Sequence, residues 1–406
     1  MSSRTGTREA QELLRADSVR PHPPGAAGGA ESPSTSTTGS APGDDPAQAP
    51  KGGKRRLHPV GFAVFLVLAL VGCSLASIRL GSAGTHSLGL IARGVLASFG
   101  LAEPLERGTQ AIVELRLWRV LTTIGVGAAL AYSGALLQGL FRNGLASPSV
   151  LGITSGASLG ATIAVLLVGG YGPLVMSPSV GLTPVLVTGF GFGGALGVAL
   201  LVASLASGGG RISVPTLLLV GIAMNLCLGG FMAAIQSLTL QDFEVSRAIL
   251  AWTFGNLDDR SGFHVGILWG GLLLAAAATP FVAVELDLFA GGEEDAEALG
   301  VDTVRVKLLT LIAAALAAAV AVGVAGQIAF VGLLVPHILR LLVGTSHRWL
   351  LPLCLLGGPV FLLGADVLQR LVLGDAPLQP GVVMSLVGGP FFLFLLVRSR
   401  QELRSW

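Results

Sequence analysis

The chain contains a series of long apolar runs, each of about the length that crosses a lipid bilayer. A transmembrane helix needs about 20 predominantly apolar residues, and a shorter helix suffices where it packs inside the protein. By this criterion we predict ten spans, at residues 58–79, 117–141, 149–168, 183–207, 214–238, 263–288, 307–326, 328–343, 349–373 and 380–398. Only 12% of the 406 residues are charged, whereas a soluble domain carries about 25%. The sequence therefore predicts an all-α, polytopic membrane protein with about ten transmembrane helices.

The first 56 residues have a different composition from the apolar runs. They are rich in Pro, Gly, Ser, Thr and Ala and contain few large apolar side chains, so they cannot bury enough surface to offset the entropy of the chain. The segment ends in Lys51, Lys54, Arg55 and Arg56, and basic residues beside a first span favour a cytoplasmic location. We predict a disordered cytoplasmic tail over residues 1–56 and a transmembrane domain over 57–400. An even number of spans then places both termini in the cytoplasm.

Arginine residues gather where this topology places the outer ends of the second and ninth spans. Counting Lys and Arg without the four Arg of the distal tail, thirteen lie inside and eight outside, in the sense of the positive-inside rule. The outer set includes Arg116, Arg119 and Arg370. Three cations at one rim suit the docking of an acidic surface, because Arg makes charge-assisted bonds to carboxylates. The alternative is that long basic side chains reach the membrane interface without a partner.

An acid also lies within the ninth predicted span. Asp366 precedes Arg370 by four residues, so the two side chains share one helix face and can pair along it. We predict this pair, since an acid inside a membrane is costly without a partner. A proton relay through Asp366 is the functional alternative.

A compact charged segment, GGEEDAEALGVDTVRVK at residues 291–307, separates two of the apolar runs. Its acids lie at the start of a short predicted helix, where the helix dipole favours negative charge, and Gly300 ends that helix. The segment is either a contact surface for a partner in the aqueous phase or an ordinary solvated connection.

Glycine is the other abundant feature, with 58 residues, and small residues let membrane helices approach closely. We interpret the pair Gly193 and Gly197 as a helix-packing GxxxG motif. The GxSxG pattern from Gly156 to Gly160 lacks the strand, turn and helix of a hydrolase elbow around Ser158, so we assign it to helix packing as well. The GxGxxG pattern at 189–194 follows no strand, which excludes a dinucleotide site.

Several classes of function are excluded by what the sequence lacks. It contains neither GxxxxGK followed by Ser or Thr nor HExxH, so it has no ATP site of its own and no zinc protease site. The three cysteines are far apart, which does not match a metal-ligand pattern. A net charge of +2 without a basic stripe gives no indication of a nucleic-acid partner. We therefore predict a protein that is not an enzyme and has no cofactor or metal in this chain.

Five segments together point to a known family. They are the run RLWRVLTTIGVGAALAYSGALLQGLFRNGLASPSVLGITSGASL at 116–159, the charged segment at 293–301, GQIAFVGLLVPHILR at 326–340, GADVLQR at 364–370, and residues 379–392. They resemble the permease subunits of ABC importers for cobalamin, haem and ferric siderophores, over about residues 58–398. Two residues depart from the family pattern, because Trp118 and Gly144 stand where Pro is usual.

The resemblance implies a homodimer in the plasma (inner) membrane, with the transport path along the dimer axis. It implies an extracytoplasmic substrate-binding protein that docks on Arg116, Arg119 and Arg370. It also implies ATPase subunits, which bind ATP and Mg²⁺ and contact the charged segment through Glu293, Glu294, Ala296, Leu299 and Gly300. We expect the small or apolar surfaces of Ala296, Leu299 and Gly300 to fit a groove of the ATPase. A cytoplasmic gate is implied in the segment made of Ser213, Val214, Pro215 and Thr216, any of which could close the path.

The expected cargo is an iron-siderophore, haem or cobalamin type of chelate. The alternative function is an ion-coupled secondary transporter or channel. That function requires buried ion-binding carboxylates, and the predicted spans offer few besides Asp366.

Overall fold

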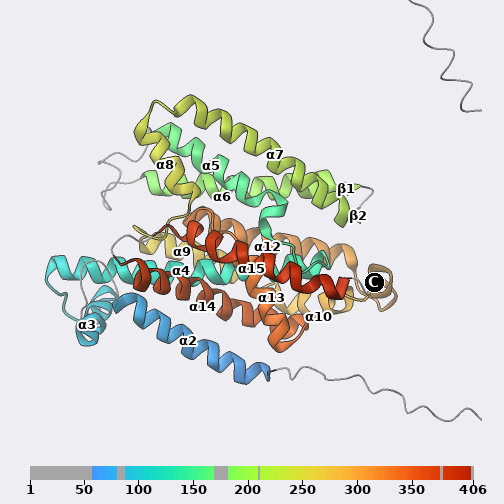
Figure 1. Cartoon of the computed structure of the whole chain (residues 1–406), viewed down its shortest axis with the longest axis horizontal. Coiled ribbons are helices and arrows are strands. Elements are labelled where there is room, and N and C mark those ends of the chain that lie inside the picture. Colours follow the sequence, from blue (N-terminus) through green and yellow to red (C-terminus); the bar gives the residue numbers. More distant parts are fainter. Residues whose placement is uncertain (1–56, 80–86, 169–181, 209–210, 375–377, 404–406) are drawn as a thin grey trace, which may run out of the picture. The chain divides into compact units, whose positions relative to one another are not determined.

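The computed structural model describes residues 57–79, 87–168, 182–208, 211–374 and 378–403. The predicted tail at 1–56 lies outside the described residues. Figure 1 shows the arrangement of the helices. In chain order they are α2 (Pro59–Arg79), α3 (Leu88–Ser98), α4 (Arg107–Leu140), the 3-10 helix η1 (Pro148–Leu151), α5 (Ile153–Val168), α6 (Leu182–Ala206), α7 (Val214–Thr239), α8 (Phe243–Thr253), α9 (Gly262–Ala276), α10 (Thr279–Phe289), α11 (Glu293–Ala298), α12 (Thr303–Ala325), α13 (Val331–Val343), α14 (His347–Leu373) and α15 (Pro380–Leu403). Between α6 and α7, β1 (Ser207–Gly208) pairs antiparallel with β2 (Arg211–Ile212).

Each of the ten predicted spans coincides with a helix or, at 263–288, with the pair of α9 and α10, which confirms the all-α membrane architecture. Among the described residues, six helices are long and apolar enough to cross a membrane, and α9 with α10 makes a seventh if that bent pair is one span. The other three predicted spans correspond to the shorter apolar helices α5, α13 and α15. The bend between α9 and α10 is 53° and lies beside Pro280, which lacks the backbone N–H that would continue the helix.

The second predicted span differs most from the structure, because α4 begins at Arg107 and not at residue 117. Trp118, at the position where the resembling family usually has Pro, keeps the N–H that an unbroken helix needs. Its ring also packs over Gly262 at the start of α9, where an added Cβ would lie 3.2 Å from the indole. With Trp118 at this position, α4 runs through residue 118 without a break.

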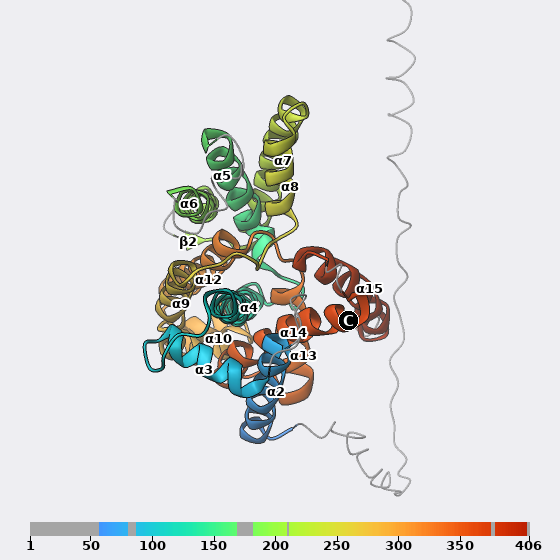
Figure 2. The ribbon, with the colours of Figure 1, turned by 90° about the vertical axis from the view of Figure 1, so that its left-hand side faces the viewer.

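Helix α4 lies at the centre of the described helices, with α9, α12, α13 and α14 around it (Figure 2). Two of its glycines contact neighbouring backbones directly. A Cβ on Gly134 would lie 1.7 Å from the carbonyl oxygen of Gly332 in α13, and one on Gly127 would lie 2.7 Å from that of Gly358 in α14. Small residues at these crossings allow the close packing on which membrane helices rely.

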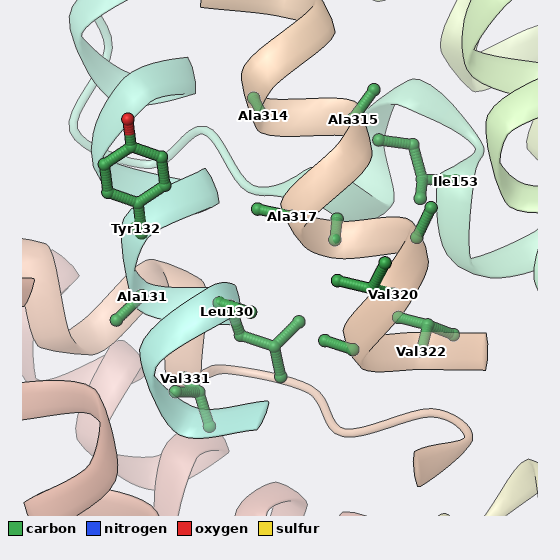
Figure 3. Packing of buried hydrophobic residues seen from close by; sticks show 14 of the residues in the cluster. Leu130, Ala131, Tyr132, Ile153, Ala314, Ala315, Ala317, Val320, Val322 and Val331 are labelled. Atoms are coloured by element: carbon green, nitrogen blue, oxygen red, sulfur yellow. The ribbon is translucent and has the colours of Figure 1, made fainter. Parts of the chain in front are cut away.

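The buried side chains of α4 face more than one neighbouring helix. Ala131 lies against Gly358 of α14, and the Tyr132 hydroxyl reaches Ala275 of α9 and Thr279 of α10. Figure 3 shows Leu130, Ala131 and Tyr132 of α4 with Ala314, Ala317 and Val320 of α12. All six are at most 5% exposed. The Tyr132 hydroxyl lies 2.9 Å from Thr279 Oγ1, and the Ser133 hydroxyl donates to Ala314 O at 2.7 Å. These bonds satisfy the polar groups inside the packed helices.

Helices α5 and α6 pack through glycine, but not through all of the predicted positions. A Cβ on Gly156 would lie 2.5 Å from Gly194 O, and one on Gly160 would lie 2.0 Å from Phe190 O. The packing role predicted for Gly156 and Gly160 is therefore confirmed. The role predicted for Gly193 and Gly197 is wrong within this chain, because an added Cβ at either would meet nothing within 4 Å. The neighbouring Gly194 makes the contact in their place.

Candidate functional site

The predicted site residues lie in two groups that are separated along α4. Arg119 belongs to the first group, and the C-terminal end of α4 at Leu140 leads to the second. These positions are 21 residues apart, which at 1.5 Å per residue is about 32 Å. The hydrocarbon core of a bilayer is about 30 Å thick. The two groups are therefore spaced to face the two sides of a membrane.

The first group is the arginine rim, which we define as Arg116, Arg119 and Arg370. Arg119 Nη2 donates to Asp366 Oδ1 at 2.7 Å, and its Nη1 makes an ion pair with Asp258 in the loop between α8 and α9. The side chain of Arg119 is 11% exposed, that of Asp366 is 3% exposed and that of Asp258 is 60% exposed. Arg119 thus bridges a buried acid and an exposed one.

The predicted pair of Asp366 and Arg370 is confirmed, with 3.3 Å between Asp366 Oδ2 and Arg370 Nε. Gln369 adds a hydrogen bond from its Nε2 to Asp366 Oδ1 at 3.2 Å. Arg116 Nη1 donates to the carbonyl of Ile78 at the end of α2, at 2.9 Å. The rim therefore joins α2, α4, α14 and the α8–α9 loop.

The second group surrounds a pocket of about 480 Å³ that we call the gate pocket. The four predicted gate residues line it together with Glu293 and Lys307. Its wall is completed by Phe141, Arg142, Leu205, Ala206, Ser207 and Phe289. The structure therefore brings the predicted gate and part of the charged segment to one place, which sequence spacing did not show.

The gate segment starts helix α7. The Ser213 hydroxyl accepts a bond from Thr216 N at 3.5 Å and another from Thr216 Oγ1 at 3.0 Å, so Ser213 is the N-cap residue. Pro215 lies in the first turn of α7, where its missing N–H costs no helical bond. Ser213, Pro215 and Thr216 are exposed, and Val214 is half-buried. The short ladder of β1 and β2 precedes this turn and joins the end of α6 to it.

The four acids predicted to start a helix, Glu293, Glu294, Asp295 and Glu297, all lie in α11, which is fastened to α12. Glu293 makes an ion pair with Lys307 of α12, and Lys307 Nζ lies 5.8 Å from the centroid of the Phe289 ring. Glu297 Oε1 accepts a bond from the Thr303 hydroxyl at 2.8 Å. These contacts hold the short helix against the first turn of α12.

The surface of α11 differs from the expected one at a single residue. Leu299 is 67% exposed, Glu294 is exposed, and Gly300 ends the helix at φ +86 with open space around it. Ala296, however, is 0% exposed, because it faces the protein on the inner side of the helix. Its methyl group is therefore not available to fit a groove of a partner, contrary to expectation.

Within the described ranges, no group of three or more His, Cys, Asp or Glu residues is placed to hold a metal ion. Two of the polar side chains inside the helices make contacts with a neighbouring element. Gln138 Nε2 donates to Leu333 O at 3.1 Å, and Asn225 Nδ2 donates to Ser149 O at 2.9 Å.

Comparisons with known proteins show which family and which structures this chain resembles. The profile described as the FecCD transport family matches residues 62–398. The chain is 38% identical over 320 residues to the cobalamin import system permease protein BtuC of Halobacterium salinarum, covering 77% of this chain and 82% of that one. It is 37% identical over 298 residues to the hemin transport system permease protein HmuU of Yersinia pestis, covering 71% and 84%. It is also 33% identical over 343 residues to the Fe(3+) dicitrate transport system permease protein FecD of Escherichia coli, covering 84% and 99%.

A solved structure of similar fold is described as an inward-facing conformation of a metal-chelate type ABC transporter. It matches with a TM-score of 0.68 and 27% sequence identity, and the match covers 84% of this chain and 99% of the other.

Proposed function

Because the chain belongs to the FecCD transport family, we propose that it moves a chelate delivered by a binding protein across the membrane, driven by ATP hydrolysis in a separate subunit. The chain is the permease subunit of an ABC importer for chelated iron, haem or cobalamin, and it is not itself an enzyme. ATP and Mg²⁺ belong to the ATPase subunits. A second copy of this chain completes the transport path.

The gate pocket is the observation that carries this proposal. Its walls include both the predicted gate residues and the Glu293–Lys307 pair that fastens α11 to α12. A displacement of α11 therefore changes the wall of the space that the gate borders. An ATPase that binds α11 differently in its ATP-bound and ATP-free forms would shift the equilibrium between closed and open gates by that difference in affinity.

The exposed face of α11 suits a contact with the ATPase. Leu299 offers a large apolar surface, Gly300 leaves room beside it, and Glu294 adds charge at the start of the helix. Ala296 has a different part in this proposal, since it packs α11 against the membrane domain. When the ATPase moves the exposed face of α11, the whole helix would then move against the membrane domain, because it is packed there and is not a loose loop.

The arginine rim serves the opposite side of the membrane in this proposal. It faces the extracytoplasmic space and receives carboxylates of the binding protein, while the gate pocket and both termini face the cytoplasm of a cell bounded by its plasma (inner) membrane. Support comes from the distance of about 32 Å along α4 and from the convergence of three arginine side chains from α4 and α14.

The cargo is the part of the proposal that the relatives leave open, since their names refer to cobalamin, hemin and Fe(3+) dicitrate. The test is uptake into liposomes that contain this chain with an ABC ATPase, supplied with a substrate-binding protein from the same organism. Each chelate class is offered separately and in competition with the others. Saturable uptake of one chelate that requires the binding protein supports the proposal, and uptake of none contradicts it.

A further inference from the structure

Arg119 of the arginine rim forms ion pairs with two acids, Asp258 and Asp366. The two acids differ in how easily each can dissociate from the guanidinium. Asp366 is 3% exposed and is held by Arg370 and Gln369 as well. Asp258 is 60% exposed and lies on the loop between α8 and α9. The docking role of Arg119, on which this inference rests, requires a new carboxylate to reach a guanidinium that is already occupied.

We propose that Asp258 is a placeholder, which occupies Arg119 in the undocked permease and is displaced by a carboxylate of the binding protein. Asp366 stays in place during this exchange. Removing Asp366 from Arg119 would weaken the compensation of a buried charge, which is costly. Asp258 becomes hydrated when it is displaced. Its loss from Arg119 costs little free energy, because exposed ion pairs contribute little to stability. The carboxylate of the binding protein thus replaces the weak contact of Asp258 with Arg119, while Asp366 keeps the guanidinium in position.

The loop that carries Asp258 also contacts the transport helices. Asn256 N donates to Ala325 O at the end of α12, at 2.7 Å, and Phe254 O accepts a bond from Gly381 N at the start of α15, at 2.9 Å. Asp259, next to the placeholder, has φ +56, a strained conformation for a residue other than glycine. Release of Asp258 therefore frees a strained loop that holds the ends of two helices, and docking at the rim can reach the membrane domain by this route.

A simpler electrostatic explanation makes a different prediction. If the acids near the rim only repel an acidic partner at long range, then removal of either Asp258 or Asp259 should strengthen docking to the same extent. A placeholder acts only through its contact with Arg119. The neighbouring residue Asp259 is the control, since it has the same charge and lies on the same loop. Its charge acts on Arg119 at a distance, but it has no ion pair with Arg119 among those found in the described part of the chain.

The experiment measures the Kd of the substrate-binding protein that supports uptake for the permease in lipid nanodiscs, at one fixed ionic strength. Asp258→Asn should bind about two- to fivefold more tightly than the unaltered chain, which is the range expected from an exposed ion pair. Asp259→Asn should change the Kd less than Asp258→Asn does. In an Arg119→Gln background the gain from Asp258→Asn should vanish, because the two residues act on one contact.

An equal gain from both Asn variants, or a gain that persists without Arg119, would overturn the placeholder. So would an unchanged Kd for Asp258→Asn. If the unaltered permease does not bind at all, the proposed docking function fails, and this inference fails with it. The exposed position of Asp258 leaves folding intact, which gel filtration of each variant in detergent checks.

Discussion

The Glu293–Lys307 pair allows a direct test of how α11 is connected to the gate pocket. We predict that Lys307→Met, which keeps an apolar stem and removes the charge, lowers the number of cargo molecules moved for each ATP hydrolysed. The pair joins a Lys side chain that is 4% exposed to a Glu side chain that is 37% exposed. It is therefore intermediate between a buried pair and a surface pair.

The size of the effect follows from these exposures. A hydrogen bond to a charged group contributes about 1.5–3 kcal/mol, and an exposed ion pair contributes about 0–1 kcal/mol. Because Glu293 can regain water when Lys307 is replaced, we expect a loss of about 1–2 kcal/mol. This corresponds to an attachment of α11 to α12 that is about 5- to 30-fold weaker.

The assay measures chelate uptake and phosphate release in the same proteoliposomes. Lys307→Met should retain ATP hydrolysis and lower the ratio of cargo to ATP by about fivefold or more. Arg305→Met is the matched control, because it makes the same change of charge at an exposed position of α12 outside the Glu293 pair and should leave the ratio unchanged. The exchanged pair, Glu293→Lys with Lys307→Glu, should recover part of it. A normal ratio in folded Lys307→Met permease would refute the connection between α11 and the gate.

Three further predictions concern packing, docking and the ATPase contact. Gly134→Leu should abolish the yield of folded permease, because even a Cβ would lie 1.7 Å from Gly332 O, whereas Gly193→Leu should fold normally in open space; gel filtration compares the two yields. Arg370→Glu should weaken docking of the binding protein by at least tenfold, since it places an acid beside Asp366, and should leave ATPase assembly intact in a pull-down; an unchanged docking affinity would count against the rim. Gly300→Val should uncouple ATP hydrolysis from uptake, because its φ of +86 is a strained conformation for valine, and normal uptake by this variant would contradict the role of α11.

Local patterns in the sequence were sufficient to predict several parts of this protein. The apolar runs predicted where the helices lie, because the need to satisfy backbone hydrogen bonds in lipid leaves few other structures. The spacing of Asp366 and Arg370 predicted their pair, because residues four apart share one helix face. The GxSxG pattern predicted a packing contact, because Gly156 and Gly160 are also four residues apart and lie on one helix face.

Contacts between distant parts of the chain could not be predicted in this way. Arg119 and Asp366 are separated by 247 residues, and no local pattern joins them. The same holds for the gate pocket, which unites the start of α7 with α11 and α12. The burial of Ala296 depends on how the six-residue helix α11 lies against its neighbours, and a helix of that length shows too little periodicity to indicate its inner face.

In the function proposed here, ATP hydrolysis in a partner subunit drives chelate import through this chain. The most direct measurement is uptake of labelled chelate into liposomes that contain the permease, with the binding protein outside, ATP present at the ATPase and all ion gradients removed by ionophores. We predict uptake under these conditions and its loss when the ATPase subunit is omitted or inactive. Uptake that persists without the ATPase and follows an imposed ion gradient would contradict the account and indicate an ion-coupled secondary transporter or channel.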